Sequence, residues 1–400
     1  MKKYLLGSLF LILYACSLQS FKLNVNSELE YCEMKVKKSL EILGDTTKMP
    51  RNILSKGDGR EWNCTSIYDW TSGFWPGILW YVYEFSGDSR IKKQAERFSS
   101  ALYPVLDRKP DNHDLGFMMY CSLGNAYRIT KKEEYKKILL QAADSLATLY
   151  DERIGTIHSW PGMRQQQGWP HNTIIDNMLN LELLFWASKH GGGKHLYDMA
   201  YRHALVTAEN QFRKDYSTCH VVIYDTISGK RLAQVTHQGY ADSSMWARGQ
   251  AWAIYGFTMC YRETGDKNFL KIAQNAADIY LRKLPSDGVP YWDFDAPDIP
   301  NEPKDASAAA IVASGLLELS SYLNEKNEKV KYFNEALKML ITLSSSSYQS
   351  RTVNDAFLLH STGHKPNNSE VDASIIYADY YYIEALMRLK KIYNNQKVIE

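Results

Sequence analysis

Apolar residues recur three to four positions apart along almost the whole chain after residue 28. Each such stripe must be buried against another element, so a chain that repeats the pattern folds as a set of packed helices. We predict about twelve helices, counted by this periodicity. They lie near residues 28–43, 72–86, 88–106, 114–130, 132–150, 174–190, 194–213, 246–264, 267–284, 306–324, 328–346 and 372–393.

Short polar breaks join successive helices into hairpins. Examples are Ser86-Gly87-Asp88, Thr130-Lys131, the run from His190 to Gly193, and Thr264-Gly265-Asp266. Glycine supplies the left-handed residue that ends a helix, and the following Asp can cap the next one. The hairpin therefore recurs as a weak internal repeat of roughly 45 to 70 residues.

The predicted helices fall into two classes. Those over 174–190 and 306–324 are apolar nearly all round, which is typical of a helix surrounded by other helices. Those over 88–106, 132–150 and 328–346 carry Lys and Glu on one face and suit an outer layer. Six inner and six outer helices predict an all-α fold, an (α/α)6 toroid, as one catalytic domain over residues 28–400. An open helical solenoid is the alternative.

The long loops all precede predicted inner helices. They cover residues 44–70, 151–173, 214–245, 285–305 and 347–371, and the third contains a short β-like segment, Cys219-His-Val-Val-Ile-Tyr224. This order places the inner helices' N-termini around one mouth. Because helix N-termini carry partial positive charge, the mouth favours an anionic ligand.

The first residues predict export. Met1-Lys2-Lys3 and the apolar run from Tyr4 to Ala15 are typical of a signal peptide, which we assign to residues 1–20. Leu13-Tyr14-Ala15-Cys16 resembles a lipobox, so the chain is either cleaved and released into a bacterial periplasm or anchored to a membrane by a lipid on Cys16. The other five cysteines are widely scattered, which argues against a disulfide framework.

Charge and motif content exclude several classes of partner. The chain has 47 Lys and Arg against 45 Asp and Glu, a formal net charge of +2, which gives no support for nucleic-acid binding. It contains neither a Cys-x-x-Cys nor a His-Glu-x-x-His pattern, so we expect no metal and no cofactor. Its 10 Trp and 28 Tyr are an unusual supply of the residues that line carbohydrate clefts.

Two carboxylates begin predicted inner helices. Asp114 opens the helix near 114–130, and Asp176 follows Ile174-Ile175 in the first turn of the helix near 174–190. Either could simply cap its helix. A carboxylate within an apolar helix nevertheless needs a partner or a purpose, and two that converge can have their pKa values pushed apart for acid–base chemistry. Asp305 and Asp372 are interpreted as caps or braces of inner helices.

Residues 237–252 combine a polar loop with the start of a helix. The segment reads His-Gln-Gly-Tyr-Ala-Asp-Ser-Ser-Met-Trp-Ala-Arg-Gly-Gln-Ala-Trp. The fork of Arg248 matches a carboxylate or sulfate, and indole faces cover the C–H surface of a sugar. If Arg248 instead braces the fold, Asp242 is a candidate partner. His220 and His237 serve as donors to substrate or as structural histidines. Trp70, Trp75 and Trp160 are candidates for stacking, with either Trp70 or Trp75 in the core.

These segments resemble glycoside hydrolase family 88, the unsaturated glucuronyl hydrolases. The matching stretches cover nearly all of the mature chain in the expected order, and together they are specific. They are Asp69-Trp-Thr-Ser-Gly-Phe-Trp-Pro-Gly77, His113-Asp-Leu-Gly-Phe117, Ile175-Asp-Asn-Met178, Thr236-His-Gln-Gly-Tyr240, Ser244-Met-Trp-Ala-Arg-Gly-Gln-Ala-Trp252, Val371-Asp-Ala-Ser374 and Asp379-Tyr-Tyr-Tyr382.

The resemblance implies an (α/α)6 barrel that removes a 4,5-unsaturated uronic acid from the non-reducing end of lyase-generated oligosaccharides, with glycosaminoglycan disaccharides as the expected substrates. It also implies that the C4=C5 double bond is hydrated, with Asp176 as general acid/base and Asp114 as the second essential carboxylate. By the same likeness, the substrate-binding residues are His113, His220, Gln238, Arg248 and Trp252, with Trp70 and Trp160 as stacking platforms.

The chain departs from the family pattern in His360-Ser-Thr-Gly-His-Lys-Pro366, where an aromatic residue is expected. Ser361 and Lys365 could instead contact a sulfate on the neighbouring sugar, and the choice among heparan, chondroitin and hyaluronan fragments stays open. Two other functions fit the same residues. One is an unsaturated rhamnogalacturonyl hydrolase acting on pectin fragments. The other is a non-catalytic glycan-binding lipoprotein, which has no need of both Asp114 and Asp176.

Overall fold

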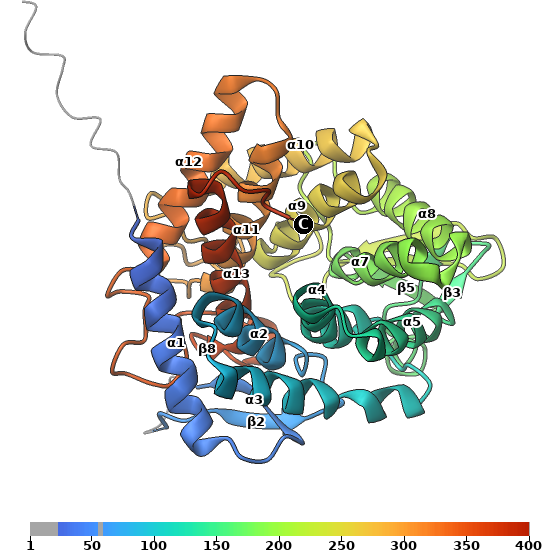
Figure 1. Cartoon of the computed structure of the whole chain (residues 1–400). Coiled ribbons are helices and arrows are strands. Elements are labelled where there is room, and N and C mark those ends of the chain that lie inside the picture. Colours follow the sequence, from blue (N-terminus) through green and yellow to red (C-terminus); the bar gives the residue numbers. More distant parts are fainter. Residues whose placement is uncertain (1–22, 55–58, 400) are drawn as a thin grey trace, which may run out of the picture.

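The computed structural model describes residues 23–54 and 59–399, and its core is a closed ring of helices. Around the ring, α2 (Phe74–Ser86) contacts the helical segment η2 (Gly116–Gly124), which continues as α4 (Asn125–Thr130). Next come α7 (Asn177–Ala187), α9 (Ala247–Thr264), α11 (Ala306–Tyr322) and α13 (Ile376–Tyr393), and α13 returns to α2. Figure 1 looks into this ring.

A second set of helices lies outside the ring. Apart from the first, each of them follows an inner helix in the sequence. These are α1 (Val25–Ile42), α3 (Ser89–Ser100), α5 (Glu133–Ala147), α8 (Lys194–Asn210), α10 (Lys267–Lys283) and α12 (Lys326–Leu343). Their burial follows the predicted difference: α11 is buried on every side from Ala306 to Ser320, whereas α3 buries only Ile91, Ala95, Phe98 and Ser99. Each of the twelve predicted helices overlaps an observed helix. A short helix, α6 (Met163–Gln166), lies in a loop.

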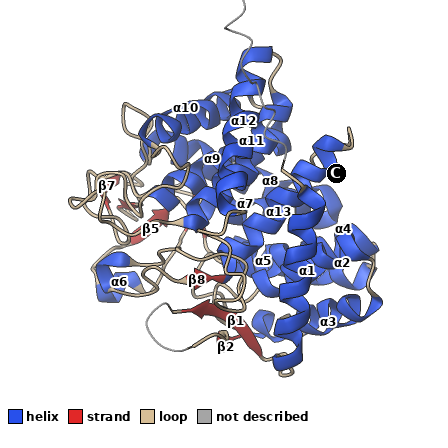
Figure 2. Ribbon diagram, turned by 90° about the vertical axis from the view of Figure 1, so that its left-hand side faces the viewer, coloured by secondary structure: helices blue, strands red, loops and turns tan. Residues whose placement is uncertain are grey.

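Strands and long loops gather at one end of the ring, on the left of Figure 2. One antiparallel sheet has the order β5 (His171–Ile174), β6 (Val221–Tyr224), β7 (Arg231–Val235), which confirms the β-like segment expected after Cys219. A second sheet, β2-β1-β8, joins β1 (Lys48–Ile53) to β2 (Asn63–Ser66) and to β8 (Ser374–Ile375). The two-stranded β3 (Tyr150–Asp151) and β4 (Thr156–Ile157) complete the set found in the described residues.

Two predicted helix boundaries are wrong in an informative way. The last helix begins at Ile376 rather than at residue 372, because Ser374 and Ile375 pair with β1 across the chain. The helix expected from residue 114 begins with π-helical turns over Gly116–Gly124 before it becomes α-helical. Tertiary contacts override helical periodicity in both places.

None of the helices in the described part of the chain is long and apolar enough to cross a membrane. The predicted signal peptide and Cys16 lie outside the described residues.

Candidate active site

Asp176 and His220 are brought together by the β5–β6 ladder. Ile174 pairs with Val221, and one residue further on the backbone N–H of Ile175 donates to the carbonyl of His220 over 3.0 Å. Asp176 then enters α7, while His220 precedes β6. The sheet thus sets a histidine from one loop against a carboxylate at the start of an inner helix.

Asp176 occupies the N-cap position of α7, but its side chain makes no capping hydrogen bond. Its Oδ2 atom is buried without a hydrogen-bond partner and lies 3.7 Å from Nε2 of His220. Burial raises the pKa of Asp176 to about 7, against the opposing effects of Arg248, a backbone hydrogen bond and Trp252. This is the behaviour of a proton donor near neutral pH rather than of a helix cap.

Asp114 is the second carboxylate of the pair and is buried, with 7% of its surface exposed. Burial raises the pKa of Asp114 well above its ordinary value, and the charges of Asp176 and Asp69 raise it further. Two carboxylates that repel each other in a dry site cannot both be charged, so the pair retains one proton near neutral pH. The effect of Asp176 on the pKa of Asp114 indicates that the two carboxylates lie near each other.

His220 faces Asp176 as a neutral donor. Its Nδ1 accepts the backbone N–H groups of His237 and Gln238, both over 3.2 Å, so the ring proton is on Nε2, the atom that faces Asp176. Burial lowers the pKa of His220 well below its usual value, and the neighbouring histidines and Arg248 act in the same direction. A neutral Nε2–H can stabilise negative charge on Asp176 or hold a substrate oxygen.

The candidate stacking residues differ in exposure. Trp70 and Trp160 are half-buried, and the edge of Trp160 meets the rings of His220 and His237 at centroid distances of 5.7 and 5.3 Å. Trp75 is a core residue against Phe98, which settles the choice between Trp70 and Trp75. Trp252 is fully buried, so its ring cannot stack on a sugar; the nearby indole lowers the pKa of Asp176.

Arg248 is built into the wall of the site. It is 2% exposed, its Nη1 bonds Asp305 Oδ2 over 2.8 Å, and its guanidinium donates to the carbonyls of Thr362 and Gly363. Asp305 is the buried partner, so the suggestion of Asp242 is wrong; Asp242 accepts the backbone N–H of Thr236 instead. Arg248 still acts on Asp176 by lowering its pKa.

The loop around Gly363 is held from several sides. Gln238 donates to the Gly363 carbonyl over 3.1 Å, and His364 Nε2 lies 2.8 Å from the carbonyl of His237. Gln238, expected to bind substrate, thus ties this loop to the one that holds His220. The loop that departs from the family pattern therefore lies at the mouth.

Asp305 and Asp372 were both expected to cap or brace inner helices. Asp305 does so, because it caps α11 through the backbone N–H of Ser307 over 3.1 Å and also pairs with Arg248. Asp372 does not cap a helix: its Oδ1 lies 2.6 Å from Nδ1 of His360, and α13 begins four residues later. Strand pairing by β8 displaces the helix start away from Asp372.

The motifs seen in the sequence are those of a known family. The sequence model of Glycosyl Hydrolase Family 88 matches residues 47–392. The chain belongs to this family. It is therefore a glycoside hydrolase.

Individual members of family 88 resemble the chain over most of its length. It is 45% identical over 331 residues to an unsaturated glucuronyl hydrolase from Formosa agariphila, covering 81% of this chain and 80% of that protein. It superposes with a TM-score of 0.88 and 41% identity on an unsaturated glucuronyl hydrolase specific for heparin, covering 93% and 98% of the two chains.

A third relative is an unsaturated glucuronyl hydrolase variant from Streptococcus agalactiae complexed with dGlcA-GalNAc6S, with a TM-score of 0.77, 31% identity and 93% coverage of both chains. These relationships confirm the activity expected from the sequence, that of an unsaturated glucuronyl hydrolase.

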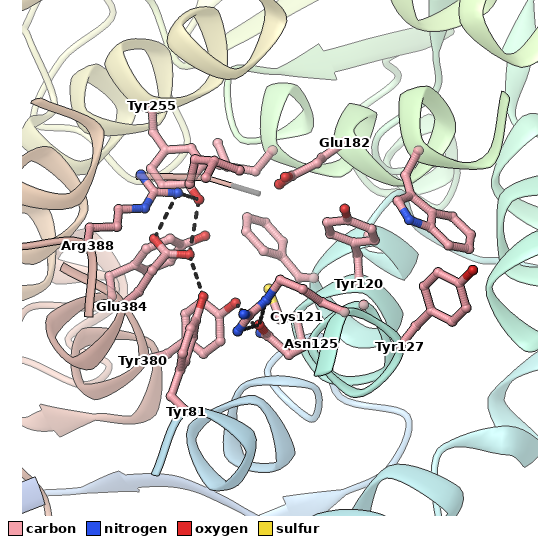
Figure 3. Close-up of a pocket in the computed structure, with 18 of the residues that line it drawn as sticks. Tyr81, Tyr120, Cys121, Asn125, Tyr127, Glu182, Tyr255, Tyr380, Glu384 and Arg388 are labelled. Atoms are coloured by element: carbon pink, nitrogen blue, oxygen red, sulfur yellow. Dashed lines mark hydrogen bonds and ion pairs between the residues drawn. The ribbon is translucent and has the colours of Figure 1, made fainter. Parts of the chain in front are cut away.

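The hydrolase also has a cavity of about 230 Å³ within the ring, among side chains such as Glu182, Tyr255 and Glu384, that lies apart from the two carboxylates (Figure 3). Tyr81 and Tyr255 donate to Glu384 over 3.0 and 3.2 Å. Ile399 also lines the cavity, and Figure 1 shows the segment after α13 running over the ring's centre. Neither Asp114 nor Asp176 lines this cavity, so we do not assign it to the active site.

Sequence reasoning missed Asn180. It is fully buried on α7, it accepts the backbone N–H of Phe117 over 2.9 Å, and its Nδ2 lies 3.3 Å from Nδ1 of His113. The signal was present, because an Asn within the apolar run Leu179-Asn180-Leu181, one turn after Asp176, needs buried hydrogen-bond partners. Within the described residues, no three His, Cys, Asp or Glu side chains form a group that could hold a metal.

Proposed function

We propose that this hydrolase releases 4,5-unsaturated glucuronic acid from the non-reducing end of lyase-generated oligosaccharides by hydrating the C4=C5 bond, with Asp176 as its acid/base. The observation that carries this proposal is the pair Asp114 and Asp176, a buried and a mostly buried carboxylate with raised pKa values, of which Asp176 closely follows strand β5. A direct displacement at C1 needs two carboxylates at a fixed separation across that carbon. Hydration needs only one acid/base beside C4 and C5.

The reaction follows from the proton that the pair holds. Protonated Asp176 gives its proton to C4, and the positive charge that develops at C5 is stabilised by the ring oxygen. The resulting Asp176 carboxylate then removes a proton from water as the water oxygen bonds to C5, which restores the acid. The hemiketal that forms at C5 opens and releases the aglycone.

Asp114 and the neighbouring side chains position the sugar in this scheme. Asp114 accepts hydrogen bonds from ring hydroxyls, while His113 and His220, both neutral, offer Nε2–H groups beside the two carboxylates. Trp70 and Trp160 cover the C–H faces of the sugars. Arg248, Gln238 and Trp252 contribute by holding the loops and the Asp176 carboxyl around the substrate.

The closed ring of inner helices supports the assignment of the fold as an (α/α)6 toroid. Six inner helical segments that contact one another in a closed circle, each backed by an outer helix, are the arrangement of an (α/α)6 toroid. An open solenoid would leave α2 and α13 apart, whereas these helices pack together. We infer that residues 28–400 form one catalytic domain.

Glycosaminoglycan disaccharides are the proposed substrates. One relative is specific for heparin and another binds dGlcA-GalNAc6S, so the source polysaccharide is best found with a panel of chondroitin, heparin and rhamnogalacturonan lyase products. Loss of absorbance near 235 nm, from the conjugated uronate, reports turnover. Activity on the rhamnogalacturonan product alone would identify the pectin enzyme, and binding without absorbance loss would identify a glycan-binding protein.

The acid/base assignment is tested with Asp176→Asn. The amide keeps the shape of the carboxyl but cannot donate and regain a proton, so kcat should fall by about 10²–10⁴-fold. Calorimetric binding of an unsaturated disaccharide should persist. A variant that keeps more than about a tenth of the wild-type kcat would remove Asp176 from this role.

The prediction that the chain is exported rests on the sequence of residues 1–20. We propose that the chain is secreted to a bacterial periplasm or anchored there through Cys16. Expression of the full chain and of Cys16→Ser, followed by membrane fractionation and mass spectrometry of the N-terminus, distinguishes the two. A lipid-anchored protein leaves the membrane fraction in the variant, whereas a cleaved one is soluble in both.

A further inference from the structure

Asn180 links the two segments that carry the candidate catalytic carboxylates. It lies on α7, one turn after Asp176, and none of its surface is exposed. Its Oδ1 accepts the Phe117 N–H over 2.9 Å, and its Nδ2 donates to His113 Nδ1 over 3.3 Å. One side chain from the Asp176 helix thus contacts residues on both sides of Asp114.

The packing around Asn180 is close and specific. A Cβ atom on Gly116 would lie 2.5 Å from the Asn180 Cα and 2.6 Å from its Oδ1, so the two helices approach at a glycine. Phe117 is in the first turn of the π-helical segment, where a backbone N–H has no acceptor within its own helix. The Asn180 carbonyl oxygen supplies that acceptor. Such π-helical segments occur often at functional sites.

The same contacts fix the tautomer of His113. Since Oδ1 of Asn180 is occupied by an N–H donor, its Nδ2 faces His113, and Nδ1 of the imidazole is an acceptor. The ring proton is therefore on Nε2, which lies 3.5 Å from Asp114 Oδ1. His113 is neutral, because burial lowers its pKa to about 3. Its Nε2–H faces Asp114 at 3.5 Å, although this atom makes no hydrogen bond in the structure.

We propose that Asn180 is a positioning residue of this hydrolase, which holds His113 in the Nε2–H form and fixes the Asp114 carboxyl opposite Asp176. The assignment rests on the proposed roles of the two carboxylates. It makes α7 the support for both of them, since Asp176 begins this helix and Asn180 reaches from it to the residues that flank Asp114.

The charges around Asp114 give the expected pH effect its sign. Burial raises the pKa of Asp114 most, the carboxylates of Asp176, Asp69 and Asp111 raise it too, and a hydrogen bond from Asn180 lowers it. His113 carries no charge at neutral pH. Loss of the Asn180 donor therefore strengthens proton binding by the pair, and the alkaline limb of the activity profile should move to higher pH.

The test compares Asn180→Asp and Asn180→Leu with a matched control, Asn125→Asp. The Asp variant keeps an acceptor for the Phe117 N–H but loses the donor to His113. Asn125 is another buried amide of the ring, bonded to the Cys121 carbonyl and the Tyr380 hydroxyl. Both Asn180 variants should lose about 10–100-fold in kcat with KM changed less than about threefold. Their alkaline limbs should move upward, while Asn125→Asp keeps the wild-type pH profile.

Tautomer assignment by ¹⁵N NMR of His113 gives a readout that does not depend on turnover. The wild type should show the Nε2–H form and Asn180→Asp the Nδ1–H form or a mixture. A folded Asn180→Asp variant with wild-type kcat, pH profile and His113 tautomer would overturn the proposal, as would equal effects in the Asn125 control. Failure of the proposed function looks different, because the wild type would then not consume unsaturated disaccharides or Asp176→Asn would remain active.

Discussion

At the scale of single residues, the raised pKa values of Asp114 and Asp176 determine when the site can act. A carboxyl whose pKa is raised stays protonated to higher pH, and burial raises that of Asp176 to about 7. Because the pair must give a proton to C4, kcat/KM should fall as pH rises above about 7, approaching tenfold per pH unit. Initial rates between pH 5.5 and 9 measure this, and a flat profile from pH 6 to 9 would contradict it.

A second prediction at the scale of single residues concerns Arg248, which bonds Asp305 and two backbone carbonyls. Lysine has one ammonium where Arg248 bonds Asp305 and two carbonyls, so Arg248→Lys leaves buried acceptors unsatisfied. We expect the free energy of unfolding to fall by about 1–3 kcal/mol. The loss in kcat/KM should be similar for sulfated and unsulfated disaccharides. Unchanged thermal stability with a loss confined to sulfated substrates would restore the role of sulfate anchor.

At the scale of elements, the positions of the helices could be predicted from the sequence, whereas the strand pairing and the π-helical turns could not. The spacing of apolar residues located the twelve predicted helices, because this pattern is local in the sequence. The β1–β8 pairing joins Asn52 to Ile375, and no local pattern encodes a contact between residues so far apart. The π-helical start at Gly116 depends on its close approach to Asn180 in another helix.

The candidate site shows the same division between local and long-range information. Asp114 and Asp176 could be found because each carboxylate adjoins an apolar helix, and the family likeness supplied their roles. The burial of Arg248 against Asp305 and the linking role of Asn180 depend on partners tens of residues away. Residue type indicates what a side chain can bond, whereas only the assembled ring shows which partner it meets.

The C-terminal segment after α13 lies across the ring on the side of the internal cavity. Val398 is 8% exposed, and Lys397 and Ile399 line the pockets beside Glu182. Deletion of the residues after Gln396 should expose this apolar surface and lower the free energy of unfolding by about 1–2 kcal/mol. The kcat should stay within about twofold, because the pockets that Lys397 and Ile399 line include neither Asp114 nor Asp176.

Denaturant unfolding and the 235 nm assay on the truncated protein measure both effects. Unchanged stability would show that the segment contributes no net packing energy. A large loss of kcat in a fully folded truncation would show that the cavity end of the ring communicates with the mouth.

At the scale of the whole molecule, buried titratable groups act on stability in opposite directions. Burial lowers the pKa of His113, His171 and His203 to about 3, whereas it raises that of Asp379 to about 8 and that of Glu182 to about 7. As pH falls below neutral, the histidines favour the unfolded state and the carboxyls favour the folded one. The pH dependence of global stability is thus a balance that a single histidine variant can resolve.

His203 is suited to this test because it is fully buried on α8 against β4. Its Nδ1 accepts the backbone N–H of Ile157 over 2.9 Å, and its Nε2 has no hydrogen-bond partner. The folded-state pKa of about 3 lies below the unfolded value near 6.5, so the unfolded chain binds the extra proton. The stability that neutral His203 contributes is complete above pH 6.5 and is lost as pH falls toward 3.

The expected outcome is a pH-dependent difference between the wild type and His203→Gln. Glutamine can offer the Ile157 N–H an acceptor but does not titrate. The variant therefore lacks the fall in the free energy of unfolding that protonation of His203 in the unfolded chain causes. Between pH 6.5 and 5.5 the stability of the wild type should fall relative to that of the variant by about 1 kcal/mol, a little under the 1.4 kcal/mol that one full pKa unit represents. Guanidinium unfolding at pH 7.5, 6.5 and 5.5 measures the two free energies. A difference that is constant across these pH values would show that His203 titrates alike in the folded and unfolded chains.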